Sequence, residues 1–227
     1  MTGITIEELE PASWLVVATG VVALAAVVLD DVWRWSRNAV TIVHEGGHAL
    51  AAVLTGRRLT GIRLHSDTSG LTLSVGRPSG VGMVVTTAAG YLSPALVGLV
   101  GVALLAADQV TVMLWGTAAL LVAMLVMIRN VYGAFTLVLS GAVVVGLSLY
   151  ASPDLQAGFG YAMTWFLLFG AVRPVGELWR QRRQNEGRYS DAAQLARLTH
   201  FPTSVWVGFF GLATGSALAA GGFLLLT

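Results

Sequence analysis

The chain has 227 residues, of which 56% are hydrophobic and only 11% are charged. This composition excludes an ordinary soluble globular protein and is typical of a chain that crosses a membrane several times. The formal net charge of +1 implies no strong electrostatic partner, so we expect no nucleic-acid ligand. There is no cysteine, which excludes disulfides and thiolate metal sites.

Apolar runs long enough to cross a bilayer predict about seven transmembrane helices. They cover roughly residues 13–29, 39–55, 81–107, 110–128, 130–150, 159–178 and 203–226. A short connector with tryptophans suited to the membrane interface is expected between the first two. Glu7, Glu8 and Glu10 precede the first run without a basic residue, which argues against a cleaved signal peptide. The expected fold is an all-α polytopic membrane protein, with residues 1–227 forming a single domain.

The second expected helix contains His44-Glu45-Gly46-Gly47-His48, an H-E-x-x-H motif. In a helix, residues four apart lie one turn apart on one face, so both imidazoles can bind one metal ion. Glu45 would then lie beside the ion without binding it. Zinc hydrolysis needs this arrangement, because zinc makes a water more acidic and the neighbouring carboxylate takes its proton.

The surroundings of the motif favour a metal site. From Asn38 to Gly56, its two histidines and one glutamate are the only ionisable residues. Ionisable groups inside a membrane span are costly, and they usually mark a functional site. The alternative interpretation is a structural histidine pair that is hydrogen-bonded within the bundle, with Glu45 protonated.

Between the second and third expected helices, residues 59–77 lack membrane character. Two stretches, 60–65 and 71–75, alternate apolar and polar residues around Asp67-Thr68-Ser69-Gly70, which predicts a β-hairpin. A hairpin that follows a metal-binding helix could pair with an extended peptide by strand addition. It could equally be a solvated loop, and the sequence leaves both interpretations open.

Arginine placement predicts the orientation of the chain. Basic side chains lie on one side of a seven-helix arrangement, within residues 57–77, at Arg129 and within residues 180–197. The loops at Asp108 and Asp154, on the other side, have none. The basic side should be cytoplasmic, with the N-terminus inside, the C-terminus outside and the metal site toward the cytoplasm. The absence of lysine hints at a GC-rich bacterial genome, and hence at the bacterial cytoplasmic membrane.

The arginines between Arg180 and Arg188 have two interpretations. The simpler one is that they only set the orientation of the chain. The other is that they contact anionic lipids, which attract basic residues next to a membrane.

Four stretches together resemble a known family. They are the motif within residues 43–50, Thr55-Gly56-Arg57 before the hairpin, Gly90-Tyr91-Leu92-Ser93-Pro94 in the next helix, and Ser190-Asp191-Ala192. They resemble the membrane-embedded zinc metalloproteases of the site-2 protease class, the M50 family, and among them the M50B-like branch. The resemblance covers roughly residues 38–210. It implies proteolysis within the membrane, with zinc held by His44 and His48 and with Glu45 as the catalytic residue.

The third zinc ligand does not follow the usual pattern of that family. Site-2 proteases typically take it from an L-D-G motif preceded by N-x-x-P, and this chain has neither. Five acids lie on the far side, at the hairpin tip or between arginines, namely Asp108, Asp154, Asp67, Glu177 and Glu186. Asp191 remains, at the start of a predicted capped helix that would have to fold back toward the bundle. Its other interpretation is a first-turn acid that the helix dipole favours.

Asn130 is a candidate for substrate binding, because its amide lies on the expected cytoplasmic side and could hold a substrate carbonyl. Its other interpretation is a turn residue between two helices. His65 and His200 are isolated loop histidines, and we leave both out of the site.

The leading hypothesis is a zinc-dependent endopeptidase that hydrolyses a peptide bond within or near a transmembrane segment. Its partners would be the lipid bilayer and a helix of a membrane-protein substrate. The alternative is a non-catalytic membrane scaffold or regulator with a structural metal site, which a fourth protein ligand would favour. A transporter is less favoured, because no internal repeat is visible. Substrate identity and oligomeric state are left open.

Overall fold

The computed structural model describes residues 11–183 and 190–227. In this part of the chain, five helices are long and apolar enough to cross a membrane: α3 (Val81–Ala106), α4 (Val110–Met127), α5 (Val131–Tyr150), α6 (Pro153–Arg183) and α8 (Thr203–Leu226). Helices α1 (Pro11–Val28) and α2 (Asp30–Leu54) pass the same test together, as a bent pair that forms either a broken span or a re-entrant loop. The chain is therefore an all-α polytopic membrane protein, with a span count close to the expected seven. Three glutamates near the N-terminus, Glu186 and Arg188 lie outside the described residues.

The bend between α1 and α2 measures 103°. Residues 30–38, expected to be a connector, instead form the first turns of α2. Asp30 and Asp31 occupy its first turn, where the helix dipole favours acids. Trp33 is buried, and its Nε1 donates a hydrogen bond to Glu177 of α6 over 2.9 Å. This tryptophan is therefore a core residue rather than an interface anchor, which explains why the helix extends through the expected connector.

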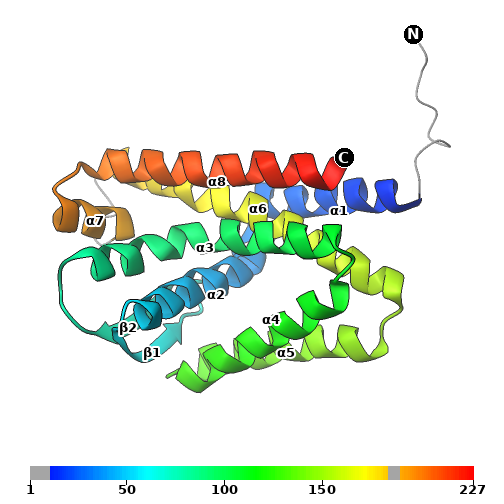
Figure 1. Cartoon of the computed structure of the whole chain (residues 1–227), viewed down its shortest axis with the longest axis horizontal. Helices are drawn as coiled ribbons and strands as arrows, with labels where there is room; N and C mark the ends of the chain where they lie inside the picture. The colour runs from blue at the N-terminus through cyan, green and yellow to red at the C-terminus, as the bar shows by residue number, and fades with distance from the viewer. Residues whose placement is uncertain (1–10, 184–189) are drawn as a thin grey trace, which may run out of the picture.

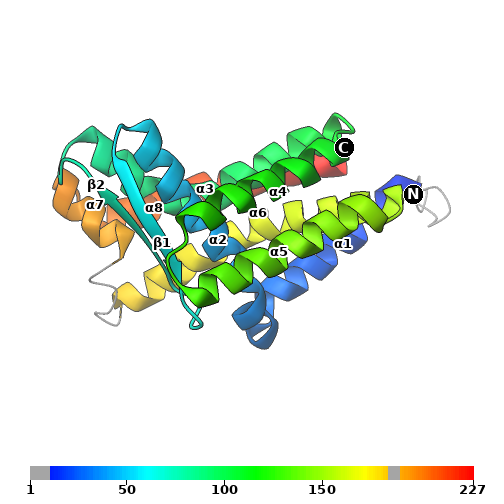
Figure 2. The same ribbon diagram turned by 90° about the horizontal axis from the view of Figure 1, so that it is seen from below.

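The basic loops gather at one end of the bundle, as the arginine pattern predicts. In Figures 1 and 2 this end holds the hairpin, the α4–α5 turn and the short helix α7 (Asp191–Thr199). The start of α1 and the end of α8 lie at the other end, with the α3–α4 and α5–α6 connections. The seven-helix arrangement places the start of the first helix on the basic side, and this is wrong for the described residues, because α1 begins at the opposite end of the bundle. The reason is that α2 continues toward the basic end instead of running back across the membrane.

The hairpin forms as predicted and lies against α2. Strands β1 (Arg58–Leu64) and β2 (Gly70–Val75) pair in antiparallel fashion. At the tip, Ser69 donates hydrogen bonds to the Asp67 carboxylate from its side chain and its backbone, and these bonds lower the pKa of Asp67. Thr41 of α2 donates a hydrogen bond to the carbonyl of Thr68 over 2.9 Å. The tip is thus fixed to the helix that carries the H-E-x-x-H motif.

Helix α7 forms the capped turn that the sequence predicts. The Ser190 side chain accepts a hydrogen bond from the backbone N–H of Ala193 over 3.3 Å, as an N-cap residue does. Ala192 and Leu195 are completely buried in a cluster with Val207 and Phe210 of α8. Because α7 is packed against both α3 and α8, its first turn has a fixed position beside α2.

Candidate metal centre and active site

Three side chains from two elements converge at one point. His44 Nε2 lies 3.1 Å from His48 Nε2, and Asp191 Oδ2 lies 3.2 Å from the first nitrogen and 3.3 Å from the second. Zinc bonds to nitrogen and oxygen ligands are about 2.0–2.1 Å long, so two corners of a tetrahedral zinc site are about 3.3 Å apart. The donor types and their spacing therefore fit three corners of a tetrahedral zinc site. The third member is the acid that elimination selected from the sequence.

The ring orientation of His48 is fixed by a backbone group. Its Nδ1 lies 2.7 Å from the carbonyl oxygen of Thr86 in α3. A carbonyl can only accept a hydrogen bond, so Nδ1 carries a proton, and Nε2 is the nitrogen that can bind a metal once it is unprotonated. The Thr86 hydroxyl is separately engaged, since it donates to Gly82 over 2.8 Å.

Helix α3 leaves room for the histidines because it has a glycine beside them. A Cβ at Gly90 would collide with His48 Nε2 and would lie 2.7 Å from Cε1 of His44. A Cβ at Gly47 of α2 would likewise collide with the Ser93 side chain, and it would lie 2.9 Å from the Ala89 carbonyl oxygen. These two glycines bring α2 and α3 close together at the site. They form the kind of small-residue interface that packs helices in membranes.

Asp191 has an environment that keeps it charged. Burial alone would raise the pKa of its carboxyl, but the hydrogen bonds to His44 and His48 outweigh burial and hold the pKa well below its usual range. The carboxylate is therefore ionised at neutral pH, which is the form that binds a metal.

Glu45 lies beside the group of three without being part of it. Its side chain is buried, with 4% of its surface exposed, and the Thr72 hydroxyl of β2 donates to its Oε2 over 2.6 Å. A Cβ at Gly70 would lie 2.5 Å from Glu45 Oε1, so β2 can cover the carboxylate only because this residue is glycine. Strand β2 thus holds the Glu45 carboxylate in place.

The model of the Peptidase M50B-like family matches residues 17–221, nearly the whole chain. The chain belongs to this family. Its members are in general zinc metalloproteases, although some are inactive. No curated protein and no solved structure matches the chain. Membership of the M50 family agrees with the multi-pass membrane architecture and with the group formed by His44, His48 and Asp191.

An aromatic side chain packs against His44 in this M50B-like chain. The Tyr91 ring meets His44 edge to face, with 5.1 Å between centroids, and it stacks on Phe210 of α8 at 4.9 Å. The ring of Tyr91 therefore connects the metal-binding helix to the last span. The stretch Gly90-Tyr91-Leu92-Ser93-Pro94 contributes both the space for His48 and the packing of His44.

Pro94 in the same stretch lies inside α3, which continues through it to Ala106. A proline has no N–H to bond to the preceding turn of the helix. Ser93 compensates, since its hydroxyl lies 3.4 Å from the Gly90 carbonyl and also bonds to the Ala89 carbonyl.

Asn130 lies in the α4–α5 turn and pairs with the hairpin. Its Oδ1 accepts a hydrogen bond from the Leu64 N–H over 3.2 Å, and its Nδ2 donates to the Leu64 carbonyl over 2.6 Å. Both amide atoms thus have a partner in β1, and a role in substrate binding stays a prediction. His65 contacts Ser69 in the hairpin, and His200 forms the left-handed C-cap of α7. Neither belongs to the group of possible metal ligands in the described chain.

Sequence reasoning missed two contributors to the site. Thr86 acts through its backbone carbonyl, which every residue has, so no sequence pattern could reveal it. Thr72 could have been found, because it is a polar residue in a strand expected to lie near the motif helix. The alternation of β2 alone does not say which of its faces meets α2.

Proposed function

We propose that this protein is a zinc-dependent intramembrane endopeptidase, which hydrolyses a peptide bond within or near a transmembrane segment of another membrane protein. His44, His48 and Asp191 would hold the ion. Bound there, zinc would make a water more acidic and polarise the scissile carbonyl. The observation that carries this proposal is the spacing of 3.1–3.3 Å among the three ligand atoms, with a buried glutamate next to them.

Glu45 would act as the general base and then as the general acid. It would take a proton from the attacking water and deliver it to the leaving amide nitrogen. The hydrogen bond from Thr72 holds the carboxylate in one orientation. Less side-chain conformational entropy of Glu45 is therefore lost on reaching the transition state. The other oxygen, Oε1, receives no hydrogen bond from the residues that the structure describes, and it would be free to accept the proton.

The outer edge of β1 is already occupied. The Ile62 carbonyl accepts a hydrogen bond from Arg129 over 2.8 Å, and Leu64 pairs with Asn130. Opposing residues in an antiparallel pair point their backbone groups either toward each other or both outward. Thr72 is opposite Ile62, and Gly70 is opposite Leu64. The backbone N–H and C=O groups of Thr72 and Gly70 therefore also point outward, away from β1.

The outer edge of β2 would therefore receive the substrate. No described residue bonds to the outward backbone groups of Gly70 and Thr72. The same two residues touch Glu45, through the close approach of Gly70 and the hydroxyl of Thr72. A substrate strand added to this edge would pass next to the general base. A transmembrane helix would have to unwind there, because strand pairing needs extended backbone.

The alternative, a scaffold with a structural metal site, is less well supported. Structural zinc sites usually have four protein ligands, whereas catalytic sites keep one position open. Within the described residues, the only group of possible ligands has three members. Because the family includes inactive members, activity still has to be measured.

We also propose the location and orientation of the site. The hairpin and α7 lie at the end of the bundle where the basic loops gather. Under the positive-inside rule this end would face the cytoplasm, in a bacterial cytoplasmic membrane if the genome is bacterial.

The proposal is tested by reconstituting the purified chain in vesicles with a panel of single-span fusion proteins that differ in helix-breaking residues. We expect zinc-loaded wild type to produce new termini within or near a span, as read by mass spectrometry. Glu45→Gln should bind zinc and release no product. Products that persist in Glu45→Gln would contradict the role of Glu45, and a zinc-loaded chain that cleaves no member of the panel would favour the scaffold.

A further inference from the structure

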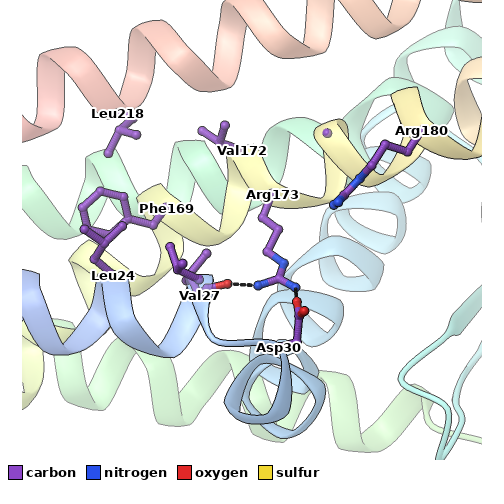
Figure 3. A pocket seen from close by; sticks show the side chains of 10 residues that line it. Leu24, Val27, Asp30, Phe169, Val172, Arg173, Arg180 and Leu218 are labelled. Atoms are coloured by element: carbon purple, nitrogen blue, oxygen red, sulfur yellow. Dashed lines mark hydrogen bonds and ion pairs between the residues drawn. The ribbon is translucent and has the colours of Figure 1, made fainter.

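A groove of about 470 Å³ lies on the face formed by α1, α6 and α8, outside the metal centre (Figure 3). One part of it is apolar and is lined by Leu24 and Val28 of α1, Phe169 and Val172 of α6, and Leu218 of α8. Its size is within the range of ordinary ligand sites. Because α6 and α8 are candidate membrane spans and α1 is part of a bent pair that passes the same test, the apolar part of the groove would face the acyl chains of a bilayer.

The other part of the groove is basic. Arg173, Gly176 and Arg180 lie at positions i, i+3 and i+7 on one face of α6, and all three line the groove. In Figure 3 the Arg180 side chain extends toward that of Arg173. A Cβ at Gly176 would meet nothing within 4 Å, so there is open space between the two arginines. The result is a hollow with guanidinium groups on either side.

The two arginines differ in how far their charge is balanced. Arg173 is paired with Asp30 at 2.5 Å and with Glu177 at 3.2 Å, and it also donates to the Val27 carbonyl. Glu177 is shared with Arg37 at 3.5 Å. Arg180 is exposed and forms no ion pair within the described chain. The groove therefore has an unbalanced positive charge at one end.

We propose that this groove binds one anionic phospholipid, with its phosphate at Arg180 and an acyl chain along Phe169 and Leu218. A negatively charged headgroup complements the free guanidinium, and an acyl chain complements the apolar part. Free phosphate would leave the apolar part uncovered, and a zwitterionic lipid would leave the positive charge unbalanced. Arg180 lies in the last turn of α6, and Figure 2 shows that α6 ends at the basic end of the bundle, where lipid headgroups would be found.

The lipid would also stabilise the bend between α1 and α2. Arg173 bonds to both sides of the bend, through Val27 and Asp30, and it stacks on Trp33 at 4.9 Å. Glu177 connects this cluster to Arg37, two turns before His44 on α2. A phosphate at Arg180 that also reaches Arg173 across the hollow would thus restrain the start of the metal-binding helix. Lipid binding itself is independent of the proposed peptidase activity.

The test is a native mass-spectrometry titration of the detergent-purified chain with phosphatidylglycerol or phosphatidylcholine of identical acyl chains. We expect wild type to bind one phosphatidylglycerol about fivefold more tightly than phosphatidylcholine, since a basic residue near anionic lipid contributes this much. Arg180→Gln should abolish the preference. Arg182→Gln is the matched control, because Arg182 contacts Trp179 and does not line the groove, and it should keep the preference. Gly176→Leu fills the hollow and should weaken binding of both lipids.

Several results would overturn the proposal. They are equal affinity for the two lipids in wild type, an equal loss in Arg182→Gln and Arg180→Gln, and displacement of phosphatidylglycerol by millimolar inorganic phosphate alone. A dimer that disappears in Gly176→Leu would show that a second copy of the chain fills the groove. If Gly176→Leu does not fold, the pair of arginine variants still decides the question.

Discussion

The Thr72 hydroxyl donates a hydrogen bond to the Glu45 carboxylate, with 2.6 Å between Oγ1 and Oε2. The two residues belong to different elements, the middle of α2 and the second strand of the hairpin. The hairpin is therefore part of the candidate active site. In the proposed mechanism it would position the general base on one side and receive the substrate at its edge.

Replacing Thr72 by valine should slow proteolysis without removing zinc. Valine keeps the shape of threonine but cannot donate to Glu45, and a hydrogen bond to a charged group contributes about 1.5–3 kcal/mol. We expect kcat to fall about 10- to 100-fold. Thr60→Val is the control, because Thr60 bonds to the Leu73 carbonyl on the same hairpin and does not contact Glu45. Equal rates in the two variants would show that the Thr72 contact has no catalytic role.

Replacing Gly90 by alanine should weaken zinc binding. The added methyl group would collide with His48 Nε2 and displace the imidazole. Changes that misplace a metal ligand typically reduce affinity about 10- to 100-fold, which a chelator competition assay can measure. Gly116→Ala is the matched control, because a Cβ at this glycine meets nothing within 4 Å. Unchanged zinc affinity in Gly90→Ala would mean that His48 is not held where the structure places it.

Hydrogen exchange should reveal the edge to which a substrate strand adds. The Thr72 amide points outward and should exchange rapidly in the free protein. In zinc-loaded Glu45→Gln, which should bind substrate without cleaving it, this amide should become protected when a single-span fusion protein is added. The Leu71 amide faces β1 and serves as the internal reference, because it should be protected in both states. No change at Thr72 on substrate binding would argue against strand addition.

Zinc should be released as the pH falls. Both histidines must be neutral to bind metal, so protons compete with zinc for their ring nitrogens as the pH is lowered. We expect the zinc content to fall as the pH is lowered and to recover when the pH is raised. Zinc content after dialysis measures this directly. His65→Gln and His200→Gln should leave the profile unchanged, and a shift in either variant would place that histidine in the site.

Much of the fold follows from local patterns in the sequence. Apolar length predicts the spans, and the alternation around Asp67 predicts the hairpin. The helical start at Asp30 was missed because Trp33, Arg34 and Arg37 resemble an interfacial connector. Only the tertiary contact between Trp33 and Glu177 shows that this stretch is helical and packed against α6. The resulting bend explains why α1 begins at the end of the bundle opposite the basic loops.

The candidate site was predictable where its chemistry follows from spacing along one helix. His44, Glu45 and His48 are placed by the periodicity of α2. Asp191 comes from a distant segment, and only elimination among the acids selected it. The contacts of Thr72 and Thr86 depend on how β2 and α3 pack on α2, so they required the structure.

Zinc stoichiometry tests the central claim most directly. Elemental analysis would compare detergent-purified wild type with His44→Ala, Glu45→Gln and Asp191→Asn, and with Asp67→Asn as a control at the hairpin tip. We predict one zinc per chain in wild type, Glu45→Gln and Asp67→Asn, loss of zinc in His44→Ala, and weaker binding in Asp191→Asn. Zinc-free wild type after reloading with the metal, or full zinc binding in His44→Ala, would contradict the proposed metal centre.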